Sequence, residues 1–113
     1  MEDVYITLLK KIGECVRVRL EPLAAQGTAS ALRRIGDDLD FYRTALRARS
    51  ENPAYWAKKS PAFEYVCELY LYLKFHPLVD ALRNRDDVPP TKTEQKAVFK
   101  CLSRVGELCG PYF

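Results

Sequence analysis

Apolar residues recur along most of this chain with the spacing of an α-helix. In residues 31–46 they form one continuous stripe, at Leu32, Ile35, Leu39, Tyr42 and Leu46. Arginines and aspartates occupy the other sides of that helix, so only one face is suited to burial. Residues 4–20 repeat the pattern after Asp3, a suitable N-cap. We expect this first helix to end near Leu20, because Pro22 lacks a backbone donor.

Residues 61–75 are apolar on nearly every side, which is typical of a central helix that other helices surround. The same residues are aromatic and β-branched enough for a strand. Ser60 and Pro61, however, form a good helix start, a capping residue followed by proline. A short helix should follow Pro77, and Thr91 opens a last helix with a capping box. The apolar face of that helix is Val98, Cys101, Leu102, Val105, Leu108 and Cys109.

The composition is that of a folded protein. With 113 residues, 48% apolar and 12% aromatic, the chain can bury a core and is too hydrophobic to be disordered. We therefore expect a single all-α domain over residues 1–113, a small bundle of about five helices around a hydrophobic central helix. Basic and acidic residues alternate and the net charge is only +3, so no nucleic-acid partner is expected.

The pattern of cysteines and the first residues of the chain predict a cytoplasmic location. The four cysteines, at positions 15, 67, 101 and 109, form no Cys-x-x-Cys pair, so we expect them to be reduced and buried in a cytoplasmic protein. No signal-peptide pattern opens the chain. The longest apolar stretch, residues 63–75, is too short to span a bilayer. The only tryptophan, Trp56, fits either a lid over the core or an exposed aromatic contact.

Nothing in the sequence resembles a catalytic or metal site. His76 is the only imidazole, and its place before Pro77 favours a helix-end or capping role over nucleophilic catalysis. Asp37, Asp38 and Asp40 do not all share one helix face, so solvated carboxylates are a better interpretation than metal ligands. We expect no enzyme, no cofactor and no metal.

Two residues in the stretch 31–46 do not fit an ordinary amphipathic helix. Gly36 costs about 1 kcal/mol relative to alanine in a helix interior, yet it lies near the apolar stripe, which suggests a close approach by another element. Asp37 places a carboxylate at the edge of the apolar face, where a cationic partner is expected.

The run Leu32-Arg33-Arg34-Ile35-Gly36-Asp37 followed by Leu39 resembles the BH3 motif of the B-cell-lymphoma (Bcl-type) family of apoptosis regulators, in the form found in Bim, Bax and Bak. The resemblance implies a helix, here residues 29–49, that lays apolar side chains into a groove on a folded partner. Leu32, Ile35 and Leu39 would then be groove anchors, Gly36 the small residue, Asp37 the partner of a groove arginine, and Tyr42 a further contact. The sequence departs from the family at the first anchor, which is Thr28.

The resemblance implies an apoptosis regulator that docks its BH3-like helix into prosurvival Bcl-type proteins. One alternative is a reduced, viral-type Bcl fold whose own groove captures BH3 helices, which would bring host–virus interaction into the picture. Another is a helical adaptor with no role in apoptosis. A partner could recruit the protein to the mitochondrial outer membrane, and a homodimer is left open. Burial separates the adaptor from the apoptotic functions. If Leu32, Ile35 and Leu39 are locked in the core and Asp37 is paired within the chain, the motif is only packing, and a docking helix would have to open before it binds.

Overall fold

The computed structural model describes residues 3–51 and 60–112, and within these ranges every regular element is helical. The elements are α1 (Val4–Cys15), a π-helical segment (Val16–Leu20), α2 (Glu21–Gln26), α3 (Ala29–Ser50), α5 (Pro61–Phe75), α6 (Leu78–Arg83), α7 (Lys92–Cys109) and a terminal 3₁₀ turn (Gly110–Tyr112). The expectation of a small all-α bundle is confirmed. The tryptophan at position 56 lies outside the described residues.

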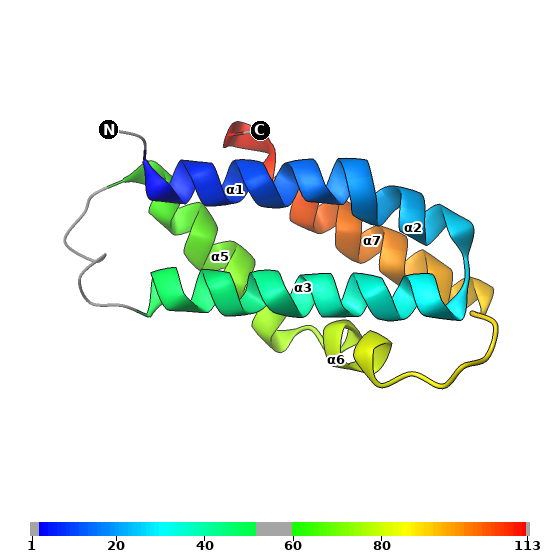
Figure 1. Cartoon of the computed structure of the whole chain (residues 1–113). Helices are drawn as coiled ribbons and strands as arrows, with labels where there is room; N and C mark the ends of the chain where they lie inside the picture. Colours follow the sequence, from blue (N-terminus) through cyan, green and yellow to red (C-terminus); the bar gives the residue numbers. More distant parts are fainter. Residues whose placement is uncertain (1–2, 52–59, 113) are drawn as a thin grey trace.

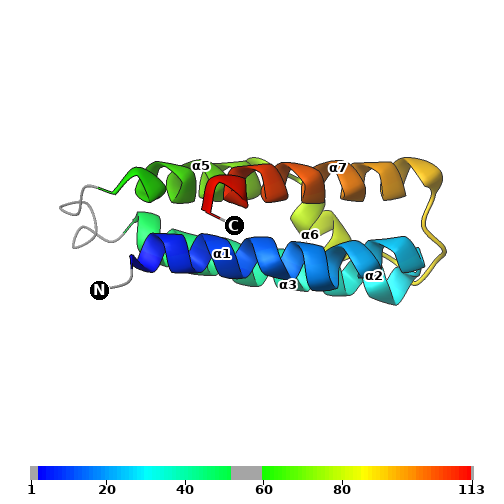
Figure 2. The ribbon, with the colours of Figure 1, turned by 90° about the horizontal axis from the view of Figure 1, so that it is seen from above.

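The helices form two layers. One layer holds α3 beside the rod made by α1 and α2, and the other holds α5 and α7 (Figures 1 and 2). The short helix α6 lies along α3 near the turn that leads toward α7 (Figure 1). Apolar side chains from all of these helices fill the space between the layers in a single core. The resulting molecule is elongated, 46 × 22 × 18 Å.

The first helical rod is longer than the sequence predicted. The chain stays helical through Pro22 and ends only at Gln26, where Gly27 takes a left-handed conformation with φ of 64°. The expectation of an end near Leu20 was wrong, because a π-helical segment from Val16 to Leu20 changes the hydrogen-bond register just before the proline. Pro22 then falls in the first turn of α2, where its missing N–H costs little.

The other predicted helix starts are confirmed. The Ser60 hydroxyl accepts a hydrogen bond from the Ala62 N–H at 3.2 Å, and the Thr91 hydroxyl accepts one from the Glu94 N–H at 3.1 Å. The second half of the capping box is not formed as expected. The Glu94 carboxylate instead accepts hydrogen bonds from Nη2 of Arg85 at 2.8 Å and from Nε at 2.9 Å. These bonds hold the loop that precedes α7.

Helix α5 is confirmed as a helix rather than a strand, but it is buried on one face only. The buried face consists of Ala62, Val66, Leu69, Tyr70 and Leu73. On the opposite face Leu71 is 49% exposed and Phe75 is 73% exposed. The central helix of the sequence prediction is therefore one member of a layer, and it leaves apolar side chains at the surface.

Candidate functional site

The candidate site lies on α3, the helix that carries the BH3-like residues. The Thr28 hydroxyl caps this helix by accepting a hydrogen bond from the Ala31 N–H at 3.2 Å. The three residues predicted as groove anchors, Leu32, Ile35 and Leu39, each have 0% exposed surface. They lie together on the face of α3 that packs into the core. In the folded chain the three anchors are therefore locked in the core. This is the arrangement expected of an adaptor whose motif only packs, and a docking helix would first have to open.

At Gly36 another element of the same chain approaches α3 closely. A Cβ atom added there would lie 2.8 Å from Cβ of Leu82 and 2.9 Å from the backbone nitrogen of Arg83. Real Cβ contacts are longer, so only glycine lets α6 sit this close to α3. The expected close approach is present, and the approaching element is the chain's own helix α6.

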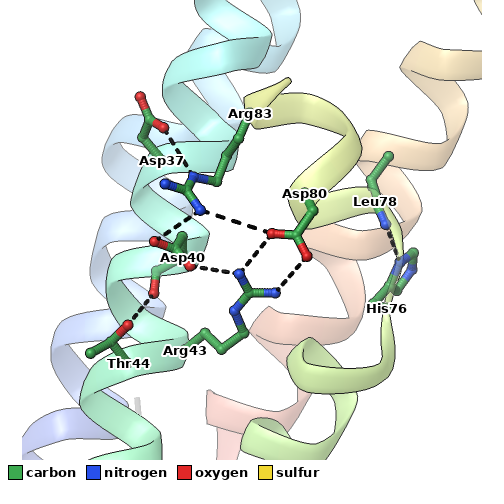
Figure 3. A network of polar contacts seen from close by, with 8 residues as sticks. All are labelled: Asp37, Asp40, Arg43, Thr44, His76, Leu78, Asp80 and Arg83. Atoms are coloured by element: carbon green, nitrogen blue, oxygen red, sulfur yellow. Dashed lines mark hydrogen bonds and ion pairs between the residues drawn. The ribbon is translucent and has the colours of Figure 1, made fainter. Parts of the chain in front are cut away.

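Asp37 also meets its cation within the chain. Nε of Arg83 lies 3.4 Å from Oδ1 of Asp37. The Asp37 side chain is 67% exposed and that of Arg83 is 40% exposed, so water screens this pair strongly. The cationic partner expected for Asp37 is therefore the chain's own Arg83, at the surface between α3 and α6 (Figure 3).

Asp37 and Arg83 belong to a larger group of charges that we call the Arg83 cluster, made of Asp37, Asp40, Arg43, Asp80 and Arg83 (Figure 3). Nη2 of Arg43 lies 2.6 Å from Asp40 and 2.8 Å from Asp80, so it links α3 to α6. Hydrogen bonds from Arg43 lower the pKa of the Asp80 carboxyl, and Asp80 raises the pKa of Arg43 in return. The cluster holds α6 along the solvent edge of α3.

Sequence reasoning did not identify Leu82 and Arg83, the residues that complete this arrangement. A weak signal was available in α6, where an apolar residue is followed directly by a cation. That pair is the chemical complement of Gly36 followed by Asp37. Nothing in the sequence, however, places α6 beside α3 rather than beside another helix.

Tyr42, the last of the predicted contact residues, is half-buried on the other side of α3. Burial, followed by a hydrogen bond with the Cys15 thiol, raises the pKa of its phenol well above the usual value. Tyr42 therefore contacts α1 rather than α6. The structure brings Gly36 and Asp37 together under α6 and leaves Tyr42 apart from them.

His76 caps α6, as its position before Pro77 predicted. Its Nδ1 accepts a hydrogen bond from the Leu78 N–H at 3.2 Å (Figure 3). Its ring stands edge-on to Tyr72, with the ring centroids 5.2 Å apart. Burial, and then the nearby charge of Lys100, lower the pKa of this imidazole, so the neutral ring that can accept the bond is favoured.

An open hollow of about 390 Å³ lies beside the Arg83 cluster, between α3, α5 and α6. Its lining residues are Asp40, Arg43, Thr44, Arg47, Glu51, Tyr70, Lys74 and Asp80. Acids and bases alternate there and largely neutralise one another. Within residues 3–51 and 60–112 no three histidine, cysteine or acidic side chains are grouped so that they could hold a metal ion.

The four cysteines are free thiols, but only Cys101 and Cys109 are buried. The expectation of burial was wrong for Cys15 and Cys67, which are half-buried. None of the described helices is both long and apolar enough to cross a bilayer. No family model, no curated protein and no solved structure matches this chain. Inferences about its function therefore depend on the residues of α3 and on what covers them.

Proposed function

We propose that this protein regulates apoptosis by docking its BH3-like helix, α3, into the groove of a prosurvival Bcl-type protein. The apolar stripe Leu32, Ile35 and Leu39 lies on one face of a single uninterrupted helix of 22 residues. Gly36 and Asp37 lie at its edge in the order that the motif requires. Such a helix has the anchors for helix-in-groove binding.

The observation that carries the proposal is the pairing of α3 with α6. Helix α6 supplies the close approach at Gly36 and the arginine at Asp37, the two features that an external groove would supply. The folded chain is therefore a closed form, and α3 binds a partner only after α6 and the core release it. Apparent affinity is reduced by the fraction of molecules in the open form.

A synthetic peptide of residues 28–47 tests the motif without the fold. It should bind prosurvival Bcl-type proteins in calorimetry, and Leu32→Ala should weaken binding about thirty-fold or more, as for a buried anchor. Arg34→Ala is the matched control, because Arg34 is exposed and lies on the opposite side of the helix. Absence of heat against a panel of such proteins, or equal losses for both changes, would refute the proposal.

The intact protein tests the closed form. It should bind the same partner more weakly than the peptide, and Arg83→Ala should strengthen binding by loosening α6. Arg104→Ala serves as control, since Arg104 is exposed to a similar degree and pairs with Glu68 and Glu107 away from α3. Equal affinities of peptide and intact protein would mean that α3 is not restrained by the fold.

A second candidate function, capture of foreign BH3 helices, draws support from a hollow of about 320 Å³ beside α1. Val4 and Leu8 give it an apolar floor, and Lys11 lies at its wall as a cation for an incoming aspartate. In this case the intact protein would bind BH3 peptides tightly, and Leu8→Asp would abolish binding. If the intact chain and the peptide of residues 28–47 both fail to bind, a non-apoptotic helical adaptor is the remaining alternative.

A further inference from the structure

Helix α6, which lies against the edge of α3, depends at its start on a titratable side chain. It spans only Leu78–Arg83, and a helix of six residues is not stable by itself in water. Its first backbone N–H, that of Leu78, donates a hydrogen bond to Nδ1 of His76 at 3.2 Å (Figure 3). The imidazole therefore supports the first turn of α6 only while Nδ1 carries no hydrogen.

Beyond this first turn, two buried side chains and a set of exposed ion pairs hold α6 in place. Val79 and Leu82 are buried, and Leu82 lies where α6 meets Gly36. The side chains of Asp80 and Arg83, which carry the ion pairs to α3, are 59% and 40% exposed, so water screens these pairs. A change in the support of the first turn can therefore shift the equilibrium between attached and detached α6.

A proton on His76 weakens the start of α6 in two ways. Nδ1 of the charged ring is a donor, so it cannot accept the hydrogen bond from the Leu78 N–H. The positive ring would also stand at the N-terminus of α6, the positive end of the helix dipole, where a cation is unfavourable. Protonation thus removes a bond and adds a repulsion at the same place.

The groups around His76 do not compensate for the added charge. The Tyr72 ring of α5 stands edge-on to the imidazole, and burial raises the pKa of its phenol to about 12, so it stays neutral. Lys74 of α5 and Lys100 of α7 are cations, and Lys100 adds to burial in lowering the pKa of the imidazole. The nearest acid on α6, Asp80, already pairs within the Arg83 cluster.

We propose that His76 is a pH-sensitive switch: protonation of its imidazole releases α6 from α3 while the two layers of the bundle stay folded. Release uncovers Gly36 and separates Asp37 from Arg83. A role of this release in docking rests on the proposed function of α3, whereas the release itself needs no partner.

The direction and the pH range follow from the groups that titrate. The fold lowers the pKa of His76, so the closed form is complete above the ordinary value of 6.5 and is lost as the pH falls toward the folded pKa. His76 is the only histidine, and histidine is the only side chain whose ordinary pKa lies between about 5 and 8. The pKa of Asp80 is held below 3.8, so its ion pairs remain charged while the imidazole titrates.

Amide hydrogen exchange of the full chain, measured by NMR and corrected for the intrinsic rate at each pH, tests the switch. Between about pH 7 and about pH 5, protection of the Ala81 and Asn84 amides, which bond within α6, should fall about fivefold, as for a lost helix cap. The fall should follow the titration of the His76 ring, and the Leu102 amide of α7 should keep its protection. Unchanged protection in α6, or an equal loss in α7, would overturn the proposal.

Four variants separate a titrating switch from a purely structural residue. His76→Asn keeps an acceptor at every pH and should leave α6 protected throughout, whereas His76→Ala lacks an acceptor and should leave it weakly protected throughout. Lys100→Gln removes a cation that disfavours the charged ring, so it should move the transition to higher pH. Lys96→Gln, exposed one turn earlier on α7, is the matched control and should not move it. A transition that persists in His76→Asn, or that Lys100→Gln does not move, would refute the switch.

Discussion

The contact at Gly36 predicts that replacing this glycine by alanine destabilises the protein, whereas the same change in a helix usually stabilises it. Replacing an exposed helical glycine by alanine ordinarily stabilises a protein by about 0.4–1 kcal/mol, because the unfolded chain loses conformational freedom. In this chain the added methyl group would lie 2.8 Å from Cβ of Leu82 and 2.9 Å from the backbone of Arg83. A backbone atom cannot move aside as the end of a flexible side chain can. Helix α6 must therefore shift away from α3.

The magnitude follows from two opposing contributions. Inserting a methyl group into a packed contact costs about 1–3 kcal/mol. The higher helix propensity of alanine offsets up to about 1 kcal/mol of this cost. Subtracting a gain of about 1 kcal/mol from this cost, we expect Gly36→Ala to lower the free energy of unfolding by up to about 2 kcal/mol. In a domain of this size each kcal/mol lowers the melting temperature by about 4–8 °C.

Gly106 provides an internal control for this measurement. It lies within α7, and a Cβ added there would have no neighbour within 4 Å. Gly106→Ala should stabilise the protein by about 0.4–1 kcal/mol. Urea unfolding of the two variants followed by circular dichroism gives the comparison. If Gly36→Ala is as stable as Gly106→Ala, α6 does not lie against α3 as described, and the closed form loses its main support.

Three further predictions concern single side chains. Asp37→Ala should change the free energy of unfolding by less than about 1 kcal/mol in a urea titration, because its ion pair is exposed; a larger loss would show that the pair is structural. Because the fold lowers the pKa of His76, stability should be complete above its ordinary value of 6.5 and fall as the pH decreases toward the folded pKa. His76→Asn should flatten that slope in melts at several pH values, and an unchanged slope would contradict the assignment. Glu94→Gln should cost about 1–3 kcal/mol, since the Arg85 side chain is only 7% exposed and loses its charged partner; chemical denaturation measures this, and a neutral result would refute it.

The sequence by itself determined where most of the helices lie and, except for α5, which face of each points inward. Apolar periodicity placed α3 and its buried stripe, and Ser60 and Thr91 marked helix starts that the structure confirms. These features depend on neighbours within a turn or two, so local sequence is sufficient. The rule that proline ends a helix failed at Pro22, and the cause was again local. A π-helical segment precedes the proline, and no residue pattern predicts it.

Only the tertiary structure decided what meets the edge of α3. The sequence indicated that something approaches Gly36 and that a cation meets Asp37, but an external groove and an internal helix satisfy both conditions equally. Leu82 and Arg83 lie more than forty residues further along the chain, and their position depends on how the layers pack. Likewise, the apolar pattern of α5 did not show which face stays uncovered. A helix with apolar residues on nearly every side can bury any of them, and the number of neighbouring helices decides which face is left to the solvent.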